Sequence, residues 1–132
     1  MKSSDLTTYI AEIKQILSHV KGIDYAYLFG SALNRLLPDS DIDILVGGDL
    51  GFDQKTKLSM ELSLRLKRNV DIILAKEASY ELIMNVFSHG ESIFINKRDS
   101  LRQDYFKSYF LYDANTALRR IRLERIKRIY GT

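Results

Sequence analysis

The sequence predicts an α/β fold: a small mixed β-sheet flanked by helices, with a long helix at the end of the chain. Apolar runs rich in β-branched residues alternate with segments whose apolar side chains recur every three or four residues, as expected when strands alternate with helices. The chain has 132 residues, 45% of them hydrophobic, and a single proline. This length and composition suit one compact unit with a buried core.

Residues 5–21 carry apolar side chains at three- and four-residue steps, so a helix is expected there. Apolar runs at residues 25–29 and 42–46 predict the first two strands. Residues 53–67 alternate apolar and polar side chains as a strand would. Their Leu, Met, Lys, Glu and Arg are helix formers, however, and β-branched residues are nearly absent, so this segment is also expected to be a helix.

The second half of the chain begins with a predicted third strand at residues 70–74, followed by a helix at 77–88. Residues 92–95 predict a fourth strand at a sheet edge. Ser100 opens a capping-box sequence, from which a long helix is expected to run towards Tyr130. Thirty helical residues span about 45 Å, which exceeds the width of a domain of this size. Part of this helix should therefore kink, fray or project.

Two carboxylates lie at the start of the second predicted strand. Asp41 and Asp43 are two residues apart, so on a strand they project to the same face, while Ile42 and Ile44 face the core. We expect the sheet to carry these carboxylates on one face and to pack its helices on the other. Two converging carboxylates suit Mg²⁺, which leaves its other positions to water and substrate phosphates. The alternative is a pair of solvated carboxylates at a strand start.

A Gly30-Ser31 corner ends the first predicted strand, and nine residues separate it from Asp41. Such a corner allows a tight turn in which backbone N–H groups approach a phosphate, and the helix that follows would add a positive dipole end. A metal site beside a phosphate site is the arrangement used in nucleotidyl and phosphoryl transfer. Ser31 could also act only as the N-cap of the following short helix.

Together these segments resemble the signature of the DNA polymerase β-like nucleotidyltransferase superfamily, and most closely its minimal nucleotidyltransferase (MNT) proteins. The likeness continues through Asp71 within the third predicted strand, where the family places a third carboxylate, and into residues 87–94. It covers about residues 5–97. The spacer departs from the family, which often has Ala-Arg-Gly where this chain has the run from Ala32 to Leu37.

The resemblance implies a catalytic and metal-binding set of Asp41, Asp43 and Asp71, with two Mg²⁺ ions and ATP as the substrate. It implies nucleotide contacts from Gly30, Ser31, Arg35 and Ser40. For Arg35 a plain surface position is an equal alternative, Ser40 could simply shape its turn, and Asp71 could be a solvent-facing strand residue.

MNT proteins of this kind pair with a HEPN-domain toxin, a putative RNase. The resemblance therefore implies an antitoxin that transfers AMP from ATP to a tyrosine of that partner in a hetero-oligomer. Two alternatives stay open: a stand-alone nucleotidyltransferase acting on a small hydroxylated molecule, and an inactive module that neutralises its partner by binding alone.

Composition narrows the remaining classes of function. The absence of cysteine excludes disulfides and thiolate metal sites and suits the cytoplasm. No apolar stretch approaches the ~20 residues of a membrane helix, and the first long segment is amphipathic, so neither a membrane span nor a signal peptide is expected. The net charge of +3 is too small to argue for nucleic-acid binding, and none is expected.

The predicted long helix combines an aromatic group with a basic run. Its aromatic residues, five within residues 105–112, exceed what one helical stripe buries against a small domain. The segment 119–128 holds six basic residues and one acid. Tyr, Phe and Arg are enriched in protein interfaces, so we divide the chain into a nucleotidyltransferase domain, residues 1–97, and a partner-docking extension, residues 98–132. The alternative is packing on the chain's own sheet with a solvated basic face.

Overall fold

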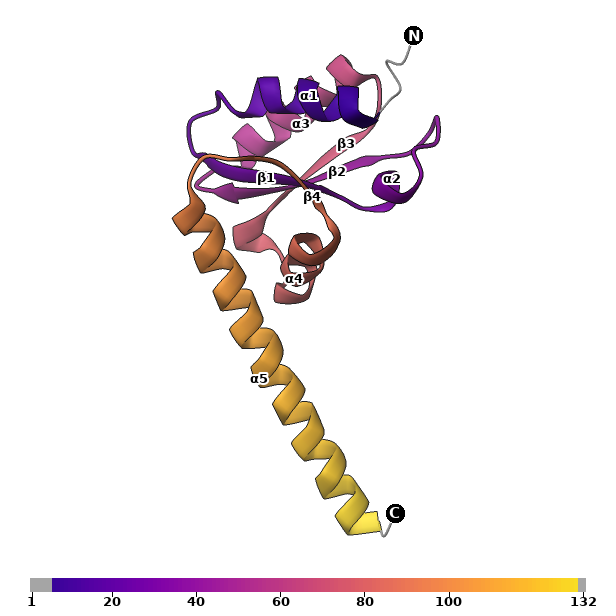
Figure 1. Cartoon of the computed structure of the whole chain (residues 1–132), viewed down its shortest axis with the longest axis vertical. Coiled ribbons are helices and arrows are strands. Elements are labelled where there is room, and N and C mark those ends of the chain that lie inside the picture. The colour runs from indigo at the N-terminus through magenta and orange to yellow at the C-terminus, as the bar shows by residue number, and fades with distance from the viewer. Residues whose placement is uncertain (1–5, 131–132) are drawn as a thin grey trace.

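A computed structural model describes residues 6–130 and shows the expected mixture of strands and helices (Figure 1). In chain order the elements are α1 (Leu6–Leu17), β1 (Ile23–Phe29), α2 (Ser31–Asn34), β2 (Ile42–Gly48), α3 (Phe52–Leu66), β3 (Val70–Leu74), the 3₁₀ turn η1 (Ala75–Glu77), α4 (Tyr80–His89), β4 (Glu91–Ile95) and α5 (Arg98–Tyr130). The predicted fold class is confirmed. Within residues 6–130, no helix has the length and apolar character needed to cross a membrane.

The sheet is mixed, with the strand order β3-β2-β1-β4. β1 pairs antiparallel with β2 and with β4, whereas β2 and β3 run parallel. The parallel pair requires a crossover, which α3 supplies. β4 lies at an edge of the sheet, as the sequence predicts.

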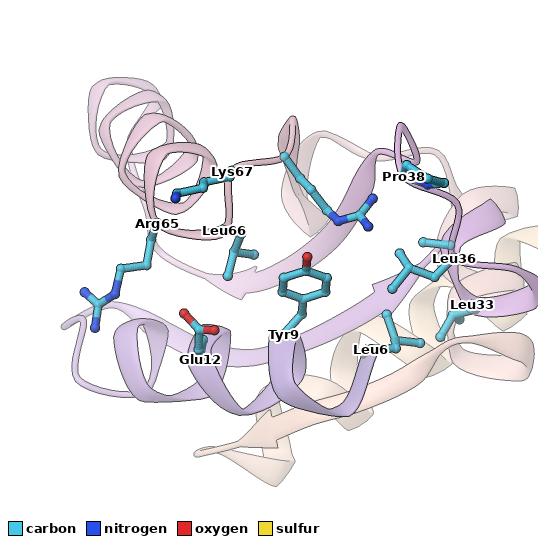
Figure 2. A pocket seen from close by; sticks show the side chains of 11 residues that line it. Leu6, Tyr9, Glu12, Leu33, Leu36, Pro38, Arg65, Leu66 and Lys67 are labelled. Atoms are coloured by element: carbon cyan, nitrogen blue, oxygen red, sulfur yellow. The ribbon is translucent and has the colours of Figure 1, made fainter. Parts of the chain in front are cut away.

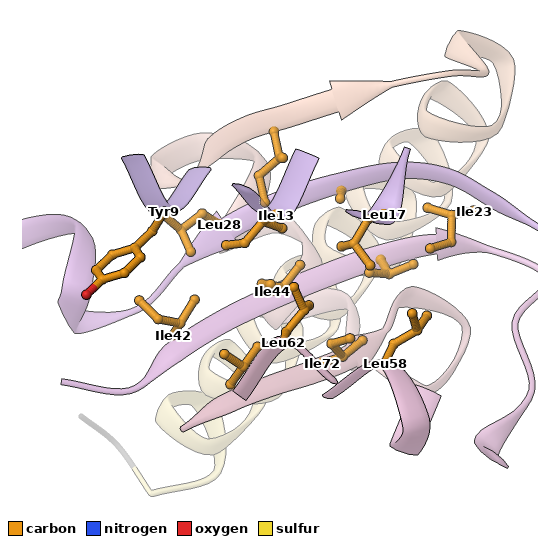
Figure 3. Packing of buried hydrophobic residues seen from close by; sticks show 14 of the residues in the cluster. Tyr9, Ile13, Leu17, Ile23, Leu28, Ile42, Ile44, Leu58, Leu62 and Ile72 are labelled. Atoms are coloured by element: carbon orange, nitrogen blue, oxygen red, sulfur yellow. The ribbon is translucent and has the colours of Figure 1, made fainter. Parts of the chain in front are cut away.

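One face of the sheet packs against α1 and α3 (Figures 1 and 3). The main core lies in this layer and joins residues of β1, β2 and β3 to Ile13 and Leu17 of α1 and Leu62 of α3, all three fully buried. Because side chains alternate along a strand, Ile42 and Ile44 of β2 point into this layer. Their burial leaves Asp43, which lies between them, on the opposite face.

The opposite face packs against α4 and α5 and has a smaller core around Tyr25, Leu45 and Val86. The expectation that helices would cover only the face without carboxylates is therefore wrong. Tyr25, Leu45 and the carboxylate-bearing positions share one face, and α4 and α5 cover part of it. This arrangement could not be predicted from the sequence, because the apolar residues of α4 could pack on either face of the sheet.

Two helices begin a few residues away from their predicted starts. The helix expected from residue 77 begins at Tyr80, after η1, and Ser79 caps it by accepting a hydrogen bond from the Leu82 N–H at 3.1 Å. The last helix begins at Arg98, two residues before the predicted capping box at Ser100. Residue 5, the predicted start of the first helix, lies outside the described residues.

α5 packs on the domain at its beginning and projects from it afterwards (Figure 1). Its 33 residues span about 50 Å. Tyr105 contacts Phe87 of α4, with ring centroids 6.1 Å apart, and Ser108 is buried. Beyond Thr116 every described side chain is exposed. The helix projects, as its length predicts, and its first turns belong to the second core.

A hydrogen bond fixes α5 to the sheet: the Tyr25 hydroxyl donates to the Asp104 carboxylate at 2.6 Å. Burial raises the pKa of Tyr25, and the neighbouring Asp104 raises it further, so the hydroxyl keeps its proton. We expect Tyr25→Phe to lower the free energy of unfolding by about 1–3 kcal/mol, because it leaves the half-buried Asp104 without this donor. Urea denaturation measures the loss. The exposed Tyr112→Phe is the control, and equal stability of the two variants would contradict the role of the bond.

Candidate active site

The three predicted carboxylates lie on one sheet face at one end of the strands. Asp43 pairs in register with Phe29 of β1 and with Asp71 of β3, and Asp41 lies one residue before β2. Asp43 is half-buried, whereas Asp41 and Asp71 are exposed. The parallel pairing of β2 with β3 thus places Asp71 directly beside Asp43, and the antiparallel pairing with β1 places Phe29 on its other side.

The electrostatics of the site are unfavourable without a cation. Burial raises the pKa of the Asp43 carboxyl, and the charges of Asp71 and Asp41 raise it further. A carboxyl whose folded pKa lies above its unfolded value costs stability once the pH is high enough to ionise it. At neutral pH the ionised Asp43 therefore opposes folding, and a divalent cation would remove that cost.

The donor set fits Mg²⁺ in an open site. The described residues contain no group of three acidic or histidine side chains already gathered closely enough to hold a metal ion. Mg²⁺ is commonly bound by one or two carboxylates and completes its octahedron with water and substrate phosphates. Asp43 with Asp41 or Asp71 would supply the carboxylates, and the exposed side of the row would admit a phosphate.

Gly30 forms the wall beside Asp43. It has φ +92°, a conformation that L side chains rarely adopt, and a Cβ built there would lie 2.5 Å from Asp43 Oδ2. This contact explains why a glycine must follow β1. It also places the Gly30 backbone directly against the carboxylate.

Gly30→Ala should therefore displace the Asp43 carboxylate as well as strain the turn. We expect Mg²⁺ affinity to fall by about tenfold or more, with a stability loss of about 1–3 kcal/mol. Isothermal titration with Mg²⁺ and a thermal melt measure the two effects. Gly51→Ala is the control, because its built Cβ meets only the Gln54 side chain, at 3.6 Å. Unchanged Mg²⁺ affinity in Gly30→Ala would contradict the assigned wall.

The other predicted nucleotide contacts differ in their surroundings. Gly30, not Ser31, is the N-cap of α2, so the N-cap interpretation of Ser31 is wrong. α2 is one turn long, too short to supply the expected dipole. Ser31 and Arg35 are exposed. Ser40 Oγ accepts a hydrogen bond from the Leu37 N–H at 2.8 Å and so shapes its turn. Nucleotide binding by Ser31, Arg35 and Ser40 stays a prediction.

A cavity of about 360 Å³ opens between α2 and α4, and Gly30 forms part of its wall. Asn34 lines it from α2, while Asn85 and His89 line it from α4. Its polar side chains and its position beside the carboxylate row suit a nucleotide. Asn34 and Asn85 were not predicted as site residues, since no sequence spacing links α4 to the Gly-Ser corner.

Comparison with known proteins points to one family. Residues 11–99 match the family model described as polymerase beta, nucleotidyltransferase. No curated protein sequence matches the chain.

Solved structures share the fold over nearly the whole chain. A crystal structure of the toxin–antitoxin MntA-HepT has 22% sequence identity and a TM-score of 0.69, covering 91% of this chain and 97% of the other. A toxin–antitoxin structure with AMP-PNP has 22% identity and a TM-score of 0.70, covering 92% and 98%. A re-refined structure of tri-AMPylated Shewanella oneidensis HEPN toxin in complex with MNT antitoxin has 23% identity and a TM-score of 0.69, covering 91% and 97%.

Proposed function

The chain belongs to the polymerase beta nucleotidyltransferase family, and we propose that it is an antitoxin that transfers AMP from ATP to a tyrosine of a HEPN-domain toxin. The observation that carries the reaction is the row of Asp41, Asp43 and Asp71 beside the Gly30 turn. Support for the acceptor comes from the similar structures, one holding AMP-PNP and another containing an AMPylated HEPN toxin with an MNT antitoxin.

In the proposed reaction an acceptor hydroxyl oxygen bonds to the α-phosphorus of ATP. The bond from that phosphorus to the α,β-bridging oxygen breaks, and pyrophosphate leaves with the electron pair. Bound Mg²⁺, taken as two ions, would neutralise the charge that develops on the phosphates. Asp41 and Asp43 would hold the metal, Asp71 would hold the second ion or accept the hydroxyl proton, and the cavity beside Gly30 would position the nucleotide.

Asp71 should act on the acceptor side of the reaction. It is exposed at the end of the row, whereas Asp43 lies between Asp71 and the Gly30 wall. We expect Asp71→Asn to slow AMP transfer by about 10²-fold or more while ATP affinity falls less. Single-turnover transfer and equilibrium binding of AMP-PNP separate the two effects. If Asp71→Asn transferred AMP at the wild-type rate, the residue would be only a solvent-facing strand position.

The distal part of α5 has the side chains expected of a surface that binds a protein partner. Its large apolar side chains are all at least half exposed, although the domain offers them nothing to pack on: Leu118, Ile121, Leu123, Ile126 and Ile129. Six basic side chains and one acidic side chain lie in the same segment, residues 119–128. Apolar and arginine side chains on one projecting helix suit docking to a partner with an acidic surface.

This projecting helix also favours a second candidate, neutralisation by binding without AMP transfer. The experiment that separates the two uses the HEPN-domain protein proposed above as the partner. Incubation of the pair with labelled ATP and Mg²⁺ should label the partner. A stable complex that never takes up label would support binding alone, and label on a small molecule instead would support the stand-alone enzyme.

A further inference from the structure

A cavity of about 770 Å³ lies away from the carboxylate face. It opens between α1, the end of α3 and the segment after α2 (Figure 2). Tyr9 lies between Leu66 on one side and Leu36 and Pro38 on the other. Tyr9 and Leu66 belong to the core on the α1 and α3 face, and this cavity shares only Leu33 with the one beside Gly30.

The charges around this cavity are unbalanced. Arg65, Lys67 and Arg68 line it together with one acid, Glu12. Within residues 6–130 the ion pairs are Lys76 with Asp49 and Lys97 with Asp24, so none of the four cavity residues is paired there. An excess of two positive charges beside an apolar floor favours an anion that carries an apolar or aromatic part.

Arg68 connects this cavity to the loop that contains Leu37 and Ser40 and leads to Asp41. Its Nη1 donates to the carbonyl oxygens of Leu37 at 2.7 Å and Ser40 at 3.1 Å, directly before Asp41. The guanidinium lies 5.1 Å from the centroid of the Tyr9 ring. Both bonds to the loop use Nη1, and Nε is buried without a hydrogen-bond partner among the described residues. The guanidinium therefore keeps donors that the loop does not use.

We propose that this cavity is a second binding site, for a small phosphate-bearing ligand with an apolar or aromatic body, and that Arg68 couples its occupancy to the loop before Asp41. The guanidinium fork matches a phosphate, and the volume lies in the range of small-molecule sites. A phosphate that binds the donors left free by Leu37 and Ser40 pulls on the same guanidinium that holds these two carbonyl oxygens. Binding would thereby shift the loop that leads into the carboxylate row.

The test is an NMR titration of the full-length Asp43→Asn protein with AMP in the presence of EDTA, which excludes metal-dependent binding in the active site. We expect saturable shifts at Leu36, Lys67 and the Arg68 Nε–H, and coupled shifts at the Ser40 and Asp41 amides. Adenosine and inorganic phosphate, tested separately, should each bind more weakly than AMP. The assay needs no AMP transfer, so its outcome is independent of the proposed function.

Two double variants test whether AMP binding depends on the charges in the cavity or only on the net charge of the protein. Arg65→Gln with Lys67→Asn should weaken AMP binding by about tenfold or more. Lys67 has φ +56°, which Asn tolerates. Lys21→Gln with Lys57→Gln removes the same charge outside the cavity and should leave the affinity unchanged. The proposal is overturned if AMP gives no saturable shifts, if the shifts lie at Gly30, Asn34 and His89 instead, or if both pairs weaken binding equally.

Discussion

Replacing Asp43 by asparagine is expected to reduce Mg²⁺-dependent AMP transfer by about 10³-fold or more while the protein stays folded. The change removes a carboxylate from the centre of the row, where Asp41 and Asp71 already oppose its ionisation. Because the folded pKa of Asp43 is raised, its loss removes an unfavourable charge at neutral pH. The melting temperature without metal should therefore stay the same or rise.

Asp41→Asn should cause a similar loss of transfer. Asp41 is exposed, so we expect little change in its metal-free melting temperature. Asp53→Asn, an exposed carboxylate in the first turn of α3, is the control and should transfer AMP normally. Wild-type ATP turnover in Asp41→Asn or Asp43→Asn would remove these residues from the site.

Removing residues after Ala117 is expected to cost most of the affinity for the protein partner and little of the stability. The deleted segment is exposed over its described length, and all four strands and the Tyr25–Asp104 bond precede it. Its apolar and arginine side chains are the residue types that dominate interface energies, so affinity should fall by about 10²-fold or more. A pull-down and a thermal melt of the same protein measure the two quantities.

A collapsed melt of the truncated protein would show that the distal helix stabilises the domain, and the docking proposal would then be dropped. Charge reversal at Arg119, Arg122 and Arg125 in the full-length chain provides a second variant. It should slow association and reduce the salt dependence of binding, because rim charges act mainly on the encounter of the two proteins.

The strands and the carboxylate pair could be predicted because their signals are local. The alternation of Ile42 and Ile44 with Asp41 and Asp43 defines two faces by geometry alone, and burial confirms this assignment of the isoleucines. The residue types of α3 likewise predicted a helix rather than a strand, and its Leu58 and Leu62 are buried at helical spacing. In each case the residues that carry the signal lie within one element.

The features that were missed depend on contacts between distant segments. Whether α4 covers the carboxylate face is decided by Val86 packing near Tyr25, and nothing in either segment alone predicts that contact. The same is true of Asn85 beside Gly30 and of Arg68 bonded to Leu37. Polar contacts of this kind have no periodicity, so only the folded arrangement reveals them.

The most direct test of the proposed AMP transfer is intact mass spectrometry of the proposed HEPN-domain partner after incubation with this protein, ATP and Mg²⁺. We predict that the partner gains the mass of one or more AMP groups, located on tyrosine by peptide fragmentation, and that Asp43→Asn abolishes the gain while the complex still forms. A partner that is bound and neutralised with its mass unchanged would contradict the proposed transfer.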